Sequence, residues 1–262
     1  MKTTILSLTT LFICIVVGCS SGEQPAESPS SDTPPDMHTS QLALDVDGTY
    51  RGILPCADCA GIQTEITLDS EMNFVKRTVY TGRSSEVFTI EDTYSWLEDG
   101  NTIRLSGLDE DEQPAFYLVG ENRLFQLDLD GNRITGDLAD HYILHKSDND
   151  LLNIYWKLIE LEGEEVHVEN YREPHIVFHS GENRVTGNGS CNNFFGTFTA
   201  EEDNRISFSP IASTKMACDE LDTETKFLRL LEQVESFTIE ESGALLLNGT
   251  NDEIIARFNS AM

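Results

Sequence analysis

The sequence predicts a mainly β protein, in which two small antiparallel β-barrel-like domains follow one another and the second contains one amphipathic helix. Three observations lead to this fold class. Short runs alternate apolar and polar residues with a period of 2, as GIQTEITL does, which is typical of strands with one buried face. Turn segments such as EDGN, GENR and LDGN separate the runs, as β-hairpins require. A polar stretch, SDNDLLN, divides the runs into two halves.

The composition is that of a protein with hydrophobic cores. Of the 262 residues, 39% are hydrophobic and 24% are charged, which argues against a disordered or fibrous chain. Asp and Glu number 46 against 17 Lys and Arg, and the net charge is -29. Such a charge repels a phosphate backbone, so nucleic acid is excluded as a partner. It also repels an anionic lipid surface, so any membrane attachment must depend on another feature.

Residues 1–18 have the features of a secretory signal peptide. Lys2 supplies the positive charge, and the apolar run at residues 11–17 is too short to span a bilayer. The signal ends in VVGC, which resembles the lipobox of bacterial lipoproteins. The resemblance implies acyl chains on Cys19 and a membrane partner held through this lipid anchor. Ser20 follows Cys19 where Asp would signal retention, so the resemblance favours the outer membrane, facing the periplasm.

Residues 19–45 connect the signal to the first predicted domain. They are rich in Ser and Pro and show no apolar periodicity until their last few residues. We therefore expect an extended, disordered tether.

Residues 46–147 form the first predicted domain. Its runs read ILPCADCAGIQTEITL, NFVKRTVYTG, VFTIEDTYSWLEDGNTIRL, AFYLVGENRLFQLDLDGNRITG and HYILHK. None of them has convincing helical spacing. About six to eight short strands in such a length favour a small antiparallel barrel or sandwich.

Residues 154–260 form the second predicted domain, in which most runs again read as strands. One segment, residues 220–234, differs because it lacks Gly and Pro and repeats apolar residues at helical spacing. The repeating residues are Phe227, Leu228, Leu231 and Val234. We expect a single amphipathic helix there, packed against the sheet.

Four of the six cysteines remain after Cys14 leaves with the signal and Cys19 takes the lipid. They are Cys56, Cys59, Cys191 and Cys218. In an oxidising compartment four thiols allow three pairings, and pairing within each half is the simplest. A disulfide between Cys191 and Cys218 closes a loop of about 27 residues and contributes on the order of 3 kcal/mol.

The segment GTYRGILPCADCAGIQTEITL, at residues 48–68, closely resembles the signature of NlpE-type envelope lipoproteins. The resemblance continues through QLDLDGNRITG and covers about residues 46–146. It implies a small lipocalin-like barrel. It also implies a role in copper tolerance, or in signalling envelope stress to a two-component sensor kinase as partner.

Cys56 and Cys59 are the candidate metal ligands. Thiolates are soft donors, and a CxxC pair can hold Cu(I), or Zn(II) if two further ligands join. A local disulfide that braces the turn before the strand fits the residues equally well. Thioredoxin-like redox chemistry fits less well, because Asp58 lies between the thiols and a strand, not a helix, follows. No cofactor is required beyond this possible Cu(I).

Two histidine pairs are candidates for the further ligands. His141 and His145 are four residues apart, as are His175 and His179, so each pair shares one face of a strand. Solvent-exposed strand histidines are the simpler interpretation of both pairs.

The second half resembles the META domain of HslJ-type envelope proteins. The residues that carry the resemblance are VTGNGSCNNFFGTF at 185–198 and TKMAC at 214–218. It covers about residues 154–260. It implies a compact β fold, a loose link to stress or drug tolerance, and no established enzymatic site. Ser190 stands where many members carry Gly.

No motif in the sequence supports catalysis. There is no GxSxG elbow, P-loop or HExxH, so we do not expect an enzyme. The sequence favours a non-catalytic envelope lipoprotein that buffers copper or reports envelope stress. The alternatives are a lipocalin-like carrier of a hydrophobic ligand and a protein-interaction module, each with a structural CxxC.

Overall fold

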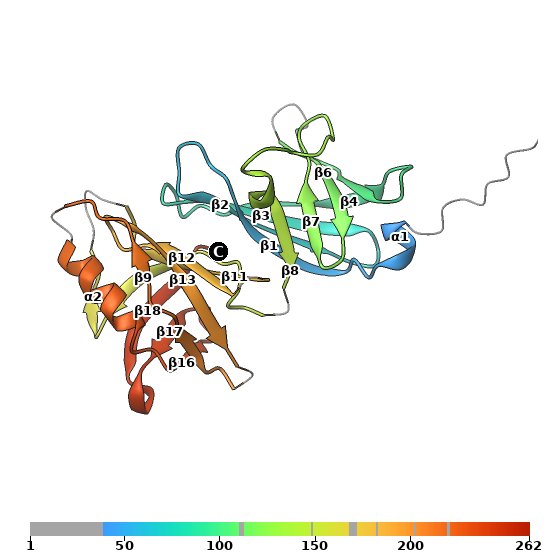
Figure 1. Cartoon of the computed structure of the whole chain (residues 1–262). Helices are drawn as coiled ribbons and strands as arrows, with labels where there is room; N and C mark the ends of the chain where they lie inside the picture. Colours follow the sequence, from blue (N-terminus) through green and yellow to red (C-terminus); the bar gives the residue numbers. More distant parts are fainter. Residues whose placement is uncertain are drawn as a thin grey trace, which may run out of the picture. The chain divides into compact units, whose positions relative to one another are not determined.

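The computed structural model describes residues 39–109, 113–147, 149–167, 172–181, 183–201, 203–218 and 221–262. Their strands form two antiparallel sheets in tandem (Figure 1). The first sheet is a closed barrel and the second is nearly closed, so the predicted mainly β fold is confirmed. The predicted signal peptide, residues 1–18, and Cys19 lie outside the described residues.

The first sheet closes because each strand pairs with the next and the last pairs with the first. Its members are β1 (Gly48–Leu54), β2 (Gly61–Leu68), β3 (Asn73–Thr81), β4 (Phe88–Trp96), β5 (Thr102–Leu105), β6 (Phe116–Gly120), β7 (Arg123–Gln126) and β8 (Ile143–Lys146). A 3₁₀ turn, η1 (Ala139–His141), precedes β8. Closure leaves no free edge within this sheet.

The period of 2 in the sequence places alternate side chains inside the barrel. Tyr50, Ile66, Phe74, Ile103 and Leu124 are among the residues fully buried there. Burial of one such side chain contributes about 1.5–3 kcal/mol, so the core favours the closed form strongly.

The structure corrects the predicted tether, residues 19–45, at its C-terminal end. A short helix, α1 (Ser40–Ala43), packs at one end of the barrel. The Ser40 amide donates to Asn101 Oδ1 at 2.8 Å, and its hydroxyl donates to the Val119 carbonyl at 2.8 Å. Sequence periodicity missed this segment because backbone and side-chain hydrogen bonds hold it, and none of its residues is buried.

The second sheet runs in the order β14-β13-β12-β11-β9-β18-β17-β16, with β10 and β15 paired at its sides. Its strands are β9 (Trp156–Leu161), β10 (Glu164–Glu165), β11 (His175–His179), β12 (Arg184–Asn188), β13 (Asn193–Ala200), β14 (Ile206–Phe208), β15 (Ala212–Ser213), β16 (Ser236–Ile239), β17 (Leu245–Asn248) and β18 (Ile254–Ser260). A 3₁₀ turn, η2 (Thr250–Asp252), precedes β18. Hydrogen bonds from Ile206 to Glu235 and from Phe237 to Asn204 join the two ends, so the sheet is nearly closed.

The predicted helix is α2 (Leu221–Leu231), shorter than residues 220–234. Its apolar side lies on the second core, where Phe227 is fully buried and contacts Phe194 and Phe258. Val234 is also buried but lies beyond the helix end. Helical spacing therefore predicted the buried side of the helix correctly. It placed the end of the helix too late, because the buried Val234 continues the spacing beyond Leu231.

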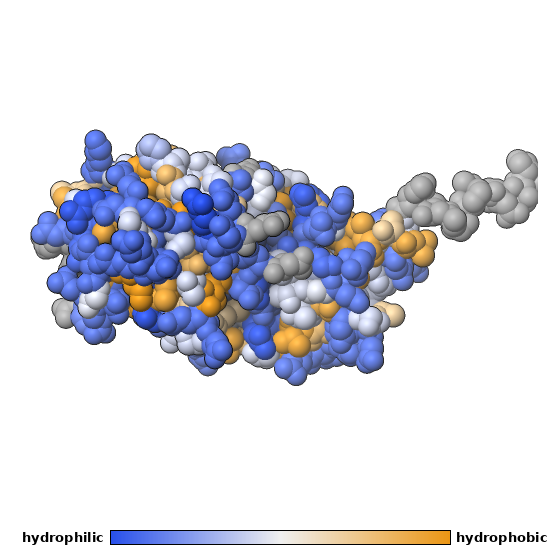
Figure 2. All heavy atoms as spheres, turned by 90° about the horizontal axis from the view of Figure 1, so that it is seen from below, coloured by the Kyte–Doolittle hydropathy of each residue, from blue (hydrophilic) through white to orange (hydrophobic). Residues whose placement is uncertain are grey.

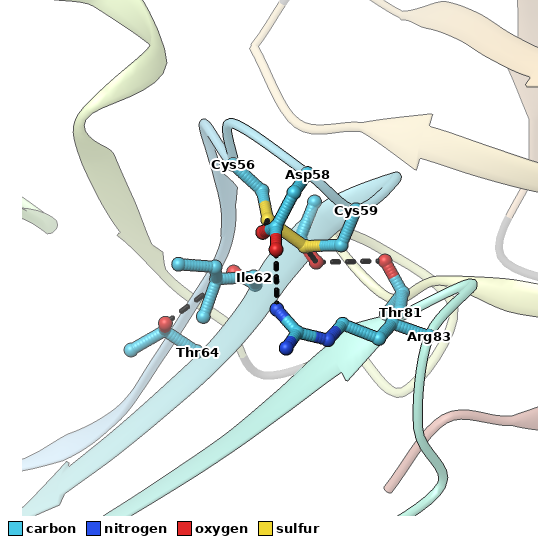
Figure 3. Close-up of a disulfide and its surroundings, with 8 residues drawn as sticks. Cys56, Asp58, Cys59, Ile62, Thr64, Thr81 and Arg83 are labelled. Carbon is cyan, nitrogen blue, oxygen red and sulfur yellow. Dashed lines mark hydrogen bonds and ion pairs between the residues drawn. A yellow bond between two sulfur atoms is a disulfide. The ribbon is translucent and has the colours of Figure 1, made fainter.

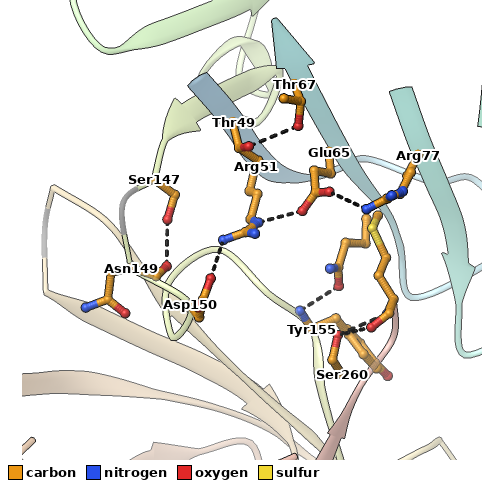
Figure 4. A network of polar contacts seen from close by, with 12 residues as sticks. Thr49, Arg51, Glu65, Thr67, Arg77, Ser147, Asn149, Asp150, Tyr155 and Ser260 are labelled. Carbon is orange, nitrogen blue, oxygen red and sulfur yellow. Dashed lines mark hydrogen bonds and ion pairs between the residues drawn. The ribbon is translucent and has the colours of Figure 1, made fainter. Parts of the chain in front are cut away.

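Polar contacts hold the chain where it leaves the barrel (Figure 4). Arg51 on β1 donates to Glu65 on β2 at 2.7 Å and to Asp150 at 3.3 Å. The Tyr155 amide donates to the side-chain oxygen of Gln63, a buried residue of β2, at 2.8 Å. Because an unpaired buried amide is costly, these contacts favour this path of the chain.

Hydrophilic residues dominate the face of the molecule seen in Figure 2, and smaller hydrophobic patches lie among them. Among the described residues, no helix has the length and apolar character needed to cross a membrane.

Candidate functional site in the Cys56–Cys59 loop

The CxxC motif lies in the loop between β1 and β2. These strands pair up to Leu54 and Ile62, so residues 55–60 form the loop at the end of the hairpin. Cys56 and Cys59 are joined by a disulfide, with their Cα atoms 5.4 Å apart (Figure 3). Both cysteines are half-buried, and Asp58 between them is exposed. The pair is therefore accessible to a small reagent.

The base of the loop is fixed by β3. The buried Thr81 hydroxyl donates to the Gly61 carbonyl at 2.9 Å, and the Ala60 amide donates to the Thr81 carbonyl at 3.0 Å. A side chain at Gly61 would come within 2.4 Å of Ile53, so glycine is needed where the two strands meet. The loop is thus exposed at its tip and rigid at its base.

Asp58 has a cationic partner from the next turn. Arg83, just after β3, lies 2.6 Å from the Asp58 carboxylate (Figure 3). Both side chains are more than half exposed, so the ion pair contributes little to stability. Its guanidinium nevertheless offsets the negative charge that Asp58 places beside the sulfurs.

Each sulfur faces an oxygen acceptor. Cys56 Sγ lies 3.6 Å from an Asp58 carboxylate oxygen, and Cys59 Sγ lies 3.3 Å from the Gly61 carbonyl oxygen. In the disulfide neither sulfur carries a hydrogen, so these are close contacts and not hydrogen bonds. A carboxylate beside a sulfur disfavours the nucleophilic thiolate on which a redox enzyme depends.

The loop fits a soft metal ion after reduction. Donor atoms of Cys56, Asp58 and Cys59 all lie within 4.8 Å of one another, and no other group of the described residues meets this condition. Two thiolate sulfurs suit the soft Cu(I) ion, whereas a four-coordinate Zn(II) site needs further ligands beyond the three donors of this loop. None of the histidines that the structure describes belongs to this group.

Cys191 and Cys218 form the second disulfide, far from the first in the sequence. Cys191 is buried beside Asn192, whose amide and side chain donate to the Glu224 carboxylate at 2.7 and 2.8 Å. Asn192 Oδ1 in turn accepts from the Thr214 hydroxyl at 2.8 Å. The bond thus lies next to a fully hydrogen-bonded buried network, as a structural disulfide does.

The structure changes the interpretation of the two predicted histidine pairs, because the two members of each pair have different surroundings. His141 belongs to η1, so it shares no strand with His145 of β8. His175 stacks on Tyr155, with ring centroids 4.2 Å apart, and burial lowers its pKa to about 4. His175 is therefore a packed residue rather than a free surface ligand. His179 donates to or accepts from Thr186 at 2.7 Å.

Arg83 and Thr81 were not found by reasoning from the sequence. Both contact the CxxC loop only because Gly61 pairs with Thr81 in the β2–β3 ladder. Strand register of this kind leaves no local signal. The same is true of Glu224, which meets Asn192 through the packing of α2.

Comparisons with known proteins agree with the motifs. Residues 50–137 match the model of the NlpE N-terminal domain family, and residues 149–262 match that of the META domain family. Lipoprotein NlpE of Escherichia coli (strain K12) is 30% identical over 86 residues. These are 33% of this chain and 36% of the E. coli protein, so the match spans about a third of that relative.

Two solved structures are similar. A putative lipoprotein from Shewanella oneidensis is 46% identical, with 43% of this chain and 98% of that chain covered and a TM-score of 0.38. The Cpx pathway activator NlpE from Escherichia coli is 16% identical, with 64% and 90% covered and a TM-score of 0.30. The family matches confirm the resemblance seen in the motifs: this chain joins an NlpE N-terminal domain, residues 50–137, to a META domain, residues 149–262.

Proposed function

We propose that this chain is a non-catalytic lipoprotein of the bacterial cell envelope, attached through lipid on Cys19, that takes part in envelope stress sensing and copper homeostasis. The Cys56–Cys59 loop is its responsive element. The observation that carries the proposal is an accessible cysteine pair at the tip of a loop whose base is fixed by Thr81 and Gly61.

The family matches support the envelope assignment. The relative in E. coli is named a lipoprotein, and the E. coli structure is described as an activator of the Cpx pathway. For this chain we propose the outer membrane, facing the periplasm, as location and an envelope stress sensor kinase as partner. The acidic charge of -29 supports the exclusion of nucleic acid.

The chemistry of the loop depends on its redox state. A dithiol reductant transfers two electrons and two protons to the Cys56–Cys59 disulfide, which gives two thiols and an oxidised reductant. The thiols then lose their protons as they bind Cu(I), and Asp58 lies close enough to offer an oxygen. Oxidation returns the disulfide and removes the site. The loop therefore binds copper only under reducing conditions.

A Cu(I) titration of the reduced full chain in detergent tests the proposal. We expect one tight equivalent against a chromophoric competitor, lost in Cys56→Ser/Cys59→Ser and kept in Asp58→Asn, which retains both thiols. Unchanged affinity in the double Ser variant contradicts copper binding at this loop.

A second candidate function, a carrier of an amphipathic ligand, is favoured by two polar groups inside the barrel. Lys76 is 6% exposed, and no described residue forms a hydrogen bond or ion pair with its ammonium group. Burial lowers its pKa to about 8. The hydroxyl of Tyr117, which is fully buried, also finds no partner among the described residues. Unpaired buried polar groups of this kind suit the carboxylate of a fatty acid.

Displacement of a fluorescent fatty acid tests the carrier function. Lys76→Met should weaken binding of the acid but not of the matching fatty alcohol, whereas Arg77→Met, on the outer face of the same strand, should change neither. Absence of saturable binding rules the carrier out.

A further inference from the structure

Three of the six histidines line one cavity of about 560 Å³. They are His141 and His145, before and on β8, and His179 at the end of β11. Spacing in the sequence pairs His179 with His175 instead. Packing of the chain brings together residues that strand spacing assigned to separate pairs.

The alternation of side chains along a strand explains why the rings of His145 and His179 point away from the two cores. Leu144 and Phe178 are fully buried in the two cores, so their neighbours His145 and His179 lie on the opposite faces of β8 and β11. Val177, two residues before His179, lines the same cavity. Two imidazoles therefore enter the cavity from rigid strands, and His141 enters from η1.

Each ring has a nitrogen available. His179 Nε2 is hydrogen-bonded to the Thr186 hydroxyl at 2.7 Å, which leaves Nδ1 for another partner. A hydrogen bond on the second ring nitrogen is the usual way in which proteins orient a metal-binding histidine. The imidazole of neither His141 nor His145 forms a hydrogen bond with any described residue.

The surroundings of His145 and His179 favour the neutral imidazole, the form that binds metal. Burial, together with the nearby positive charge of Arg184, lowers the pKa of His179 to about 4. Burial and Arg123 lower the pKa of His145.

The charged residues of the cavity balance one another. Arg123 and Arg184 line it together with Asp137 and Asp140. The two carboxylates are exposed and lie on the segment that leads into His141, so the lining contains two acidic and two basic side chains. The ring nitrogens are not all within 4.8 Å of one another, so a shared ion requires a change of side-chain rotamer, for which the exposed His141 has room.

We propose that His141, His145 and His179 form a binding site for a divalent transition-metal ion, Zn²⁺ or Cu²⁺. Three imidazoles are a donor set that such borderline ions prefer, and a nearby Asp or water completes the coordination. The site is distinct from the Cys56–Cys59 loop, because its donors are nitrogens and it needs no reduction.

Zn²⁺ titration of the full chain in detergent tests the proposal, with Cys56→Ser and Cys59→Ser in the background. This background lacks both thiols of the loop, so they cannot bind the added Zn²⁺. We expect one equivalent of Zn²⁺ against a chromophoric chelator, weakened at least about tenfold by His179→Ala and by His145→Ala. His167→Ala, which removes an exposed histidine outside the cavity, should leave the affinity unchanged.

The imidazole NMR signals of the same background protein provide a readout that needs no histidine variant. Zn²⁺ should shift the signals of His141, His145 and His179 and leave those of His167 and His175 in place. Absence of stoichiometric Zn²⁺ binding overturns the proposal, as do equal affinity in His179→Ala or shifts at other histidines.

Discussion

The two disulfides of this protein are the same bond in two very different surroundings. Cys56 and Cys59 are three residues apart and half-buried, in a hairpin loop whose tip, residues 57–58, is exposed. Cys191 and Cys218 are 27 residues apart, and Cys191 is 5% exposed. The first constrains a loop whose strands are already paired, whereas the second joins the turn between β12 and β13 to the segment before α2.

This difference teaches that burial and loop length, not the bond itself, distinguish a structural disulfide from a reactive one. In the chain-entropy model a short loop contributes about 2 kcal/mol and a loop of 27 residues about 3.5 kcal/mol. The buried bond also lies against Asn192 and Glu224, and a side chain at Gly189 would come within 2.5 Å of Glu224. The exposed bond has no such packing.

Loss of the buried disulfide should give the largest effect. We expect Cys191→Ser/Cys218→Ser to lower the free energy of unfolding of the META domain by about 3.5 kcal/mol, because the unfolded chain gains the freedom of a long loop. Urea unfolding, followed by the fluorescence of Trp156 in the second core, measures this. The comparison fails if the loss is no greater than that in Cys56→Ser/Cys59→Ser.

Acid should affect the META domain next most strongly. Because the folded pKa of His175 is about 4, below its ordinary value of 6.5, the folded state resists protonation. The contribution of neutral His175 to the free energy of unfolding is therefore full above pH 6.5 and is lost as the pH falls toward about 4. The drop in pKa corresponds to roughly 3 kcal/mol. His179, with a pKa of about 4, acts in the same direction.

Urea unfolding at pH 7 and at pH 4.5, with a chelator present, measures the acid effect. His175→Phe keeps a ring against Tyr155 but does not titrate, so its loss between the two pH values should be smaller than that of the parent chain. An equal loss in both proteins contradicts a role of His175. No histidine lies in the Cys56–Cys59 loop, so the redox behaviour of that loop should not follow this titration.

Loss of the exposed disulfide should have a smaller effect. We expect Cys56→Ser/Cys59→Ser to lower the free energy of unfolding of the barrel by no more than about 2 kcal/mol. The pairing of β1 with β2, which reaches Leu54 and Ile62 beside the loop, holds these strands without the bond. Far-UV circular dichroism of the variant should remain that of the parent. A variant that unfolds at once would show that the loop is structural.

The fold could be predicted from the sequence because its determinants are local. The alternation in β2 and the spacing of Phe227 and Leu231 in α2 report buried faces directly. α1 could not be predicted, because its hydrogen bonds to Asn101 and Val119 come from residues far along the chain.

The site was predictable only in part, for the same reason. The CxxC spacing alone identified Cys56 and Cys59, whereas Arg83 reaches Asp58 through the register of β2 with β3. The histidines of the cavity could be predicted even less well from spacing in the sequence. Spacing of four residues paired His175 with His179, but one ring packs on Tyr155 and the other faces the cavity.

The smallest change in stability should come from Arg83→Gln. This variant tests most directly why the Cys56–Cys59 pair should be more reactive than the buried disulfide. The ion pair with Asp58 is exposed, so we expect a loss below about 1 kcal/mol. The reduced thiols should nevertheless react more slowly with iodoacetamide at pH 7, because the unbalanced Asp58 charge disfavours the thiolate. Asp58→Asn, which removes that charge, should react faster than the parent. If both variants react at the parent rate, the surroundings of the loop do not set its reactivity, and exposure alone distinguishes it from the buried disulfide.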